Sequence, residues 1–257
     1  MRSVRWRKVF RDLGSHKMRT VLVVLSIAVG VFAIGTIAGA DAMLQRNLTT
    51  SYANSRPASA TLFTAGFDQS LVDAIRDMRG IADAEGRRSG TVRLRTADGG
   101  YREMQLTAIT DFKDQRLDLV DPQRGSWPPE RGEVAVERSS LQVEPLELGQ
   151  RLTVQTVDGK LHDLDLVAID HEVGAAPAFY IGRVQAHVTP ETLEDLGFGT
   201  GFDELRIRVA DASLDQDGVQ AVADEVSTRL ERAGVRVFGS YVPVSYTHLT
   251  LPTKLEV

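Results

Sequence analysis

The residues best suited to chemistry in this sequence gather in one short stretch. They are histidines and carboxylates, which bind metal ions and transfer protons. The group consists of His162, Asp163, Asp165, Asp170, His171 and Glu172. Its first members stand in an alternating segment, Leu161 to Ile169, and alternate residues of a strand face opposite sides of a sheet. We interpret the group as solvent-facing strand residues followed by a polar turn, and a metal site is the alternative.

Motifs of several common enzyme classes are missing from the sequence. A G-x-x-x-x-G-K-[ST] phosphate loop and a G-x-S-x-G nucleophile elbow do not occur. His171-Glu172 has no second histidine four residues after the first, so the zinc motif of metalloproteases is absent. The chain has no cysteine, which excludes disulfides and thiolate metal sites. We therefore expect a protein that is not an enzyme, with no catalytic residues, no cofactor and no metal.

The elements that position these residues begin with a β-α-β-β unit. Residues 58–64 read as a strand, and Asp68 is typical of the N-cap of a helix that runs to about Arg79. Residues 91–96 and 101–109 alternate on either side of an Asp-Gly-Gly turn, which predicts a hairpin.

A second unit of the same kind stands near the end of the sequence. Residues 204–209 alternate as a strand, 215–233 have the apolar spacing of a helix, and 235–238 read as another strand. Gly234 suits the position after the helix. The two units together predict one α+β sandwich, with helices on one face of a mixed sheet, built from residues 57–112 and 201–243.

The segment between these units has short strands and tight turns. Its predicted strands are 133–137, 151–157, 160–169 and 183–188. Thr189-Pro190 is typical of the start of a helix, with threonine at the N-cap and proline at the first helical position. We interpret residues 113–200 as a β-rich subdomain inserted into the sandwich.

An uncharged apolar run, residues 20–40, divides the sequence into two parts of opposite charge. As a helix of about 1.5 Å rise per residue it matches a bilayer core of about 30 Å, so we expect a transmembrane helix. Residues 1–19 hold seven basic residues and one acidic residue, although the whole chain has a net charge of −5. Basic flanks stay in the cytoplasm, which predicts an extracytoplasmic main domain on the bacterial cytoplasmic membrane. Its acidic charge argues against nucleic acid as a partner.

The leader, residues 1–19, has the pattern of a basic amphipathic helix that lies in the membrane interface. The residues expected at the lipid surface are Trp6, Phe10, Arg5, Arg7, Lys8 and Arg11. A cleaved signal peptide is the alternative, since Ala38-Gly39-Ala40 fits a cleavage site, but the apolar run is longer than the roughly 7–15 residues of a signal peptide.

Small residues within the run predict that this helix packs against other membrane helices. The residues on the two small-residue faces include Ser26, Gly30, Ala33, Gly35 and Gly39. Beyond the run, residues 41–56 have few helix breakers and predict a stalk that continues the helix.

Together the leader and the apolar run resemble the N-terminus of ABC-transporter permeases of the MacB/FtsX-like class. The segment Gly125 to Glu137, GSWPPERGEVAVE, resembles a GxWPPxxGEVxxE stretch of that family, and LELGQRLTV follows at 146–154. The order of the two β-α-β units around a β-rich insertion is similar to the family's extracytoplasmic core domain, a porter-like module.

The resemblance implies a permease subunit that couples ATP hydrolysis by a cytoplasmic ABC ATPase to movements of the extracytoplasmic domain. Such permeases act as dimers and serve mechanotransmission: they export or extract a substrate, or regulate an envelope partner protein. They have at least four spans, whereas this sequence has one apolar run. Residues 244–253, VSYTHLTLPT, resemble a translated sequencing adaptor, so we expect 244–257 to be a non-native tail on a truncated permease. The alternatives are a genuine short tail, a single-span anchored module that binds a ligand or the cell wall, and an anchored hydrolase.

Overall fold

The computed structural model of this chain describes residues 18, 21–22, 25–32, 35–36 and 54–243. The chain divides into two compact units, Met1–Ser51 and Tyr52–Val257. The described residues of the first unit are α-helical and exposed. Within the described ranges, no helix has both the length and the apolar character needed to cross a bilayer. The predicted leader and stalk lie largely outside these ranges, the predicted span is described in part, and the predicted tail lies wholly outside them.

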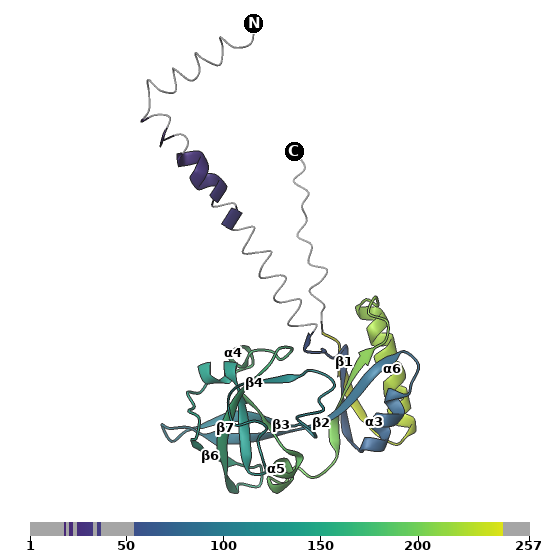
Figure 1. The fold of residues 1–257 in the computed structure, drawn as a ribbon. Helices are drawn as coiled ribbons and strands as arrows, with labels where there is room; N and C mark the ends of the chain where they lie inside the picture. The colour runs from purple at the N-terminus through teal and green to yellow at the C-terminus, as the bar shows by residue number, and fades with distance from the viewer. Residues whose placement is uncertain (1–17, 19–20, 23–24, 33–34, 37–53, 244–257) are drawn as a thin grey trace. The chain divides into compact units, whose positions relative to one another are not determined.

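The second unit consists of strands with helices at a few of their connections. Its elements are β1 (Ala60–Phe67), α3 (Gln69–Arg76), β2 (Ile81–Arg95), β3 (Tyr101–Ala108), β4 (Val120–Gly125), β5 (Glu133–Glu137), η1 (Arg138–Gln142), β6 (Arg151–Gln155), β7 (Leu161–Glu172), α4 (Ala178–Ile181), β8 (Val184–Val188), α5 (Pro190–Asp195), β9 (Phe202–Val209), α6 (Gln216–Arg232) and β10 (Val237–Tyr241). Figure 1 shows how they form two lobes joined by β2.

The strands of the described chain form one mixed sheet in the order β10-β1-β9-β2-β3-β8-β5-β7-β4. Strand β6 pairs with both β2 and β7, which closes β2, β3, β8, β5, β7 and β6 into a ring. We call this part the ring lobe. Strands β1, β9 and β10, with the first half of β2 and helices α3 and α6, form the helical lobe, and β4 pairs with β7 beside the ring.

Local signals set the ends of the helices. The side chain of Asp68 accepts a hydrogen bond from the backbone N–H of Leu71 at the start of α3. Asp215 and Thr189 cap α6 and α5 in the same way. The residue after α6, Gly234, has a φ of 85°, which glycine adopts without strain. The starts of α3, α5 and α6 were predicted from the sequence and are confirmed.

Each lobe has its own apolar core. In the helical lobe, Val72 and Ile75 of α3 and Val226 of α6 pack on strands β1, β9 and β2. The core of the ring lobe includes Met104 and Leu106 of β3. The two cores are fully separate clusters, so the lobes meet through other groups.

The α+β class predicted from the sequence is confirmed: helices lie with a mixed sheet in which β3–β8 and β5–β7 are parallel pairs. The packing differs from the prediction within β2. Residues 91–108, predicted with the sandwich, contribute to the core of the ring lobe, because the far half of β2 and all of β3 are needed to close the ring. The domain boundaries themselves stay a prediction.

The Trp-Pro-Pro segment forms the connection into β5. Its Trp127–Pro128 peptide bond is cis, and the Trp127 ring packs edge-on against Phe112 with centroids 4.9 Å apart. Just before it, a Cβ added at Gly125 would lie 2.1 Å from the carbonyl oxygen of Val167, so only glycine fits against β7 there. This segment therefore fixes the path of the chain from β4 to β5.

Candidate functional site

Only some of the predicted membrane residues are among those that the structure describes. Ser26, Gly30 and Gly35 are helical and exposed, and a Cβ built on either glycine has no atom within 4 Å. Their packing against other spans stays a prediction. The other predicted membrane residues fall outside the described ranges: Ala33, Gly39, Trp6, Phe10, Arg5, Arg7, Lys8 and Arg11.

The histidine–carboxylate group of residues 162–172 is divided by the fold. Asp163 and Asp165 are exposed on β7 and bond Thr153 and Arg151 of β6, as expected for solvent-facing strand residues. The predicted polar turn after Ile169 is wrong, because β7 continues to Glu172 and buries Asp170 completely. No group of three or more metal-ligand side chains that could hold an ion occurs among the described residues.

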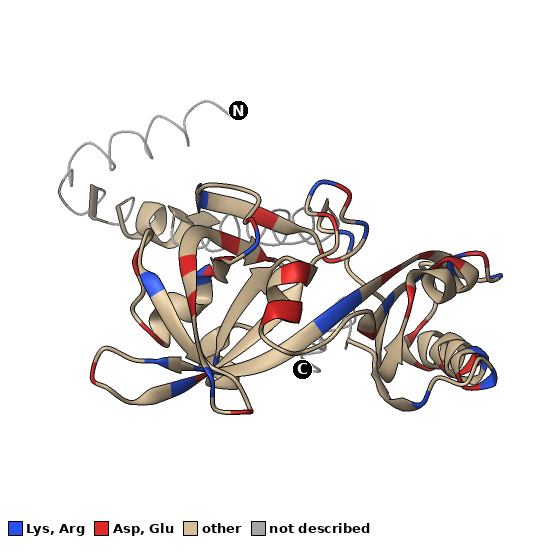
Figure 2. Ribbon diagram, turned by 90° about the horizontal axis from the view of Figure 1, so that it is seen from below, with Lys and Arg blue, Asp and Glu red and all other residues tan. Residues whose placement is uncertain are grey.

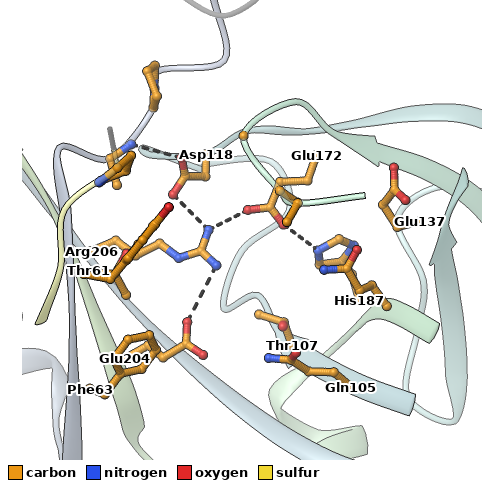
Figure 3. A pocket seen from close by; sticks show the side chains of 18 of the residues that line it. Thr61, Phe63, Gln105, Thr107, Asp118, Glu137, Glu172, His187, Glu204 and Arg206 are labelled. Atoms are coloured by element: carbon orange, nitrogen blue, oxygen red, sulfur yellow. Dashed lines mark hydrogen bonds and ion pairs between the residues drawn. The ribbon is translucent and has the colours of Figure 1, made fainter. Parts of the chain in front are cut away.

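A cavity of about 260 Å³ lies where the two lobes meet, and we call it the interlobe cavity. One side is the outer face of the ring lobe, with Gln105 and Thr107 of β3. The opposite side is the helical lobe, with Thr61 and Phe63 of β1 and Arg206 of β9. Figure 3 shows these side chains pointing into the same space.

The polar face of the cavity follows from strand alternation. Along β3, Met104 and Leu106 point into the core of the ring lobe, so Gln105 and Thr107 point outward. Parallel pairing with β8 sets Gln105 beside Gln185 and Thr107 beside His187. The second lobe covers this outward face, and the result is buried polar surface.

Arg206 of β9 is the centre of an ionic network that crosses between the lobes. Its Nη1 atom lies 2.6 Å from Oε1 of Glu172 and 2.9 Å from Oδ2 of Asp118. Its Nη2 atom lies 3.6 Å from Oε2 of Glu204. Burial opposes the charged form of Arg206, but the three carboxylates outweigh it and raise the pKa of the guanidinium. Arg206 is therefore a permanent charge.

Arg87 of β2 joins the same network and is fully buried. Its Nε atom lies 2.9 Å from Oε1 of Glu85, and its Nη1 atom 3.5 Å from Oε1 of Glu172. Its Nη2 atom donates to the carbonyl oxygens of Leu117 and Asp118, at 2.7 and 3.0 Å. Every nitrogen of this guanidinium thus has a partner, as a buried charge requires.

His187 of β8 is held between two carboxylates of β7. Its Nδ1 atom lies 2.8 Å from Oδ2 of Asp170, and its Nε2 atom 3.2 Å from Oε2 of Glu172. Burial lowers the pKa of the imidazole, but Asp170 and then Glu172 outweigh it and raise that pKa to about 9. His187 is therefore protonated at neutral pH.

The carboxylates respond to the same network. Burial raises the pKa of Glu172, but Arg206, His187 and Arg87 lower it well below its ordinary value. Asp118 behaves oppositely: its burial raises the pKa of the carboxyl group and outweighs Arg206. Glu172 is thus the charge shared by all three cations.

Asp118 also binds the segment through which the chain enters the domain. Its Oδ1 atom accepts a hydrogen bond from the backbone N–H of Ala58 at 3.0 Å. Its backbone N–H donates to the carbonyl of Arg56 at 3.0 Å, and the next N–H, of Leu119, donates to the carbonyl of Ser55 at 2.9 Å. Residues 55–58 are therefore attached to the ionic network by Asp118.

Sequence reasoning missed most of this site. Arg206 lies on a predicted alternating strand, where it resembles a solvent-facing residue. Arg87 lies between the predicted elements, and Asp118 lies in the predicted insertion, residues 113–200. The one signal was His171 and its acidic neighbours, of which Glu172 and Asp170 do belong to the network.

No protein-family model matches the sequence, and no curated protein matches it. Among solved structures, the chain is similar to the periplasmic region of MacB from Actinobacillus actinomycetemcomitans, with 9% identity and a TM-score of 0.45, over 70% of this chain and 87% of that one. It is also similar to the extracellular domain of the noncanonic ABC-type transporter YknZ from Gram-positive bacteria, with 10% identity and a TM-score of 0.46, over 71% and 100%. At these identities and TM-scores, neither similarity assigns a function.

Proposed function

We propose that this chain is a permease subunit of an ABC transporter of the MacB/FtsX-like class. Residues 54–243 stand outside the cytoplasmic membrane and have no catalytic role. A cytoplasmic ABC ATPase binds the membrane part of a permease dimer, and ATP hydrolysis moves the outer domain. That movement exports or extracts a substrate, or acts on an envelope partner protein.

The observation that carries this proposal is the attachment of the incoming segment to the ionic network. Residues 55–58 follow the apolar N-terminal part, and they bind Asp118 by side chain and backbone. Asp118 binds Arg206 of the helical lobe, and Arg206 binds Glu172 of the ring lobe. A displacement of residues 55–58 would therefore be transmitted to both lobes through these hydrogen bonds and ion pairs.

The end of the domain lies beside its beginning. Strand β10 pairs antiparallel with β1, with Thr61 opposite Tyr241, and Pro57 and Pro243 both line the interlobe cavity. A domain whose two ends are adjacent fits between two consecutive membrane segments. This geometry supports the permease proposal.

A single-span anchored module that binds a ligand or the cell wall is the second candidate. The observation that favours it is the interlobe cavity, which has both polar and apolar lining residues and lies between two lobes, a common position for ligand sites. This candidate needs no ATPase, so the two functions are separable by experiment.

The absence of cysteine makes the topology easy to test. Val157 is 91% exposed at a turn of the ring lobe, and Ser3 lies in the basic leader. In intact cells we expect a membrane-impermeant maleimide to label Val157→Cys, and to label Ser3→Cys only after the membrane is opened. Labelling of both variants, or of Ser3→Cys alone, in intact cells would contradict an extracytoplasmic domain.

Coupling to ATP needs a second measurement, with the ABC ATPase encoded beside the native gene. Thr61 lines the interlobe cavity, whereas Val157 follows β6 in the ring lobe and is not a lining residue. We expect the labelling rate of Thr61→Cys to differ between the nucleotide-free and the vanadate-trapped complex, with Val157→Cys unchanged. Equal rates for Thr61→Cys in the two states, in a complex that hydrolyses ATP, would favour the anchored binding module.

A further inference from the structure

We propose that the interlobe cavity binds a small organic ammonium cation. Three properties of its lining support this ligand class: an excess of carboxylates, an unpaired acceptor on its floor, and two aromatic rings from neighbouring strands. The proposal does not depend on the transport function, because binding by the chain needs neither ATP nor an ATPase.

The charge of the lining favours a cation. Four carboxylates line the cavity against two cations, Arg206 and His187. Both cations already have carboxylate partners within 3.2 Å, although Nε of Arg206 has no hydrogen-bond partner among the described residues. The lining carboxylates are Asp118, Glu137, Glu172 and Glu204. A cationic ligand would balance the excess, which in a partly buried site is costly to leave uncompensated.

The floor of the cavity offers a hydrogen-bond acceptor without a partner. Oε1 of Gln185 is buried and has no hydrogen bond among the described residues. Gln105, its neighbour in the sheet, also lines the cavity. Buried polar atoms are nearly always paired, so an N–H or O–H donor of a ligand is the expected partner.

Two aromatic rings line the cavity from the helical lobe. Phe63 of β1 and Tyr241 of β10 are 41% and 58% exposed. Tyr241 stands opposite Thr61, which lies on the same face of β1 as Phe63. Aromatic faces attract organic cations through the ring quadrupole, most strongly when carboxylates complete the site.

The size of the cavity limits the ligand. Its volume of about 260 Å³ is near the lower end of ligand pockets, which begin at roughly 300 Å³. A molecule of amino-acid size, such as choline or ethanolamine, fits this limit, and a large peptide does not.

The test is isothermal titration of the full chain, in detergent, with choline, ethanolamine and tetramethylammonium as separate probes. The matched control ligand is 3,3-dimethylbutan-1-ol, which has the shape of choline without its charge. We expect saturable binding of at least one ammonium probe. Its affinity should exceed the affinity for the neutral alcohol, and that for sodium at equal ionic strength, by about tenfold or more. No binding by any ammonium probe at millimolar concentration, or equal binding of choline and the alcohol, would overturn the proposal.

Two variants on one strand locate the binding. Tyr241→Ala removes a ring of the cavity, whereas Phe238→Ala removes a 66% exposed ring of β10 that is not among the lining residues. We expect the first variant to weaken binding about fivefold, the value of one cation–π contact, and the second to leave it unchanged. Both side chains are largely exposed, so folding should be retained. An equal effect of the two variants would contradict the assignment to this cavity.

Discussion

Two faces of the same strands have opposite chemistry in this protein. The inner face of β3 and β8 carries Met104, Leu106 and Ala186, each at most 1% exposed, in the core of the ring lobe. The outer face of the same strands carries Gln105 and His187, which line the interlobe cavity. Both faces are covered, but only one is apolar.

The inner and outer faces of these strands contribute differently to stability. Burial of the inner face stabilises the fold in proportion to apolar area. Burial of charged groups on the outer face gives little net stability, because desolvation offsets their mutual attraction. Stability therefore does not account for the polar groups under the second lobe, and the coupling and ligand binding proposed above would both use them. The charged residues spread over both lobes in Figure 2 carry no such signal, because most of them face solvent.

Removal of the shared charge should have the largest effect. Glu172→Gln leaves Arg206, Arg87 and His187 without their common partner, and we expect a loss of about 3 to 5 kcal/mol in the free energy of unfolding. Urea unfolding followed by Trp127 fluorescence, in a Trp6→Phe background, measures it. Glu225→Gln, exposed on α6, is the control and should change nothing. A free energy of unfolding that is unchanged in Glu172→Gln, as in the control, would show that the outer face holds no ionic network.

A substitution on the inner face should cost nearly as much for a different reason. Leu106→Ala removes a fully buried side chain and leaves a cavity, with an expected loss of about 2 to 5 kcal/mol. Refilling the space with Leu106→Met should recover most of it. A loss under 1 kcal/mol for the alanine variant would mean that the ring lobe is loosely packed.

The pH dependence should report on His187. The pKa of this imidazole is about 9 in the folded protein, above the roughly 6.5 of an unfolded chain. Its contribution to stability is fully present below pH 6.5 and is lost as the pH rises through 9, by up to about 3 kcal/mol. The groups around it are Asp170 and Glu172 of β7, with Arg206 and Arg87 beyond Glu172.

His187→Gln is the comparison for that measurement. We expect the difference in unfolding free energy between pH 6 and pH 9.5 to be smaller in this variant than in the parent chain. The same pH dependence in both chains would show that His187 is not the group that titrates.

The smallest effect on stability is expected from Gln105→Ala, on the outer face of β3. Gln105 is next to Leu106 in the strand, but the Gln105 side chain has no hydrogen bond among the described residues. We expect a change within about 0.5 kcal/mol. A large loss, comparable to that of Leu106→Ala, would erase the contrast between the two faces.

Local features of the fold could be predicted from the sequence. Asp68, Thr189-Pro190 and Asp215 mark helix starts because caps act within a few residues. The end of β7 was placed too early, since Asp170 and Glu172 look like a polar turn and only their buried partners keep them in the strand.

The candidate site could not be predicted, because its contacts are distant in sequence. Arg87 meets Glu172 across 85 positions, and Arg206 meets Asp118 across 88. Alternation along β9 places Arg206 opposite the apolar residues, which normally means solvent. The ring lobe, which packs against that face, leaves the Arg206 side chain only 13% exposed.

The sheet order also has a consequence for biosynthesis. All six strands of the ring lie between residues 81 and 188, so the ring can close before the rest of the chain is made. Among the described residues, β1 pairs with β9 and β10 alone, and these are synthesised last. At about 5–20 residues per second, β1 emerges from the ribosome on the order of ten seconds before β9. During that time both of its edges are open to aggregation or chaperones, so the yield of folded protein should depend on β1 being shielded.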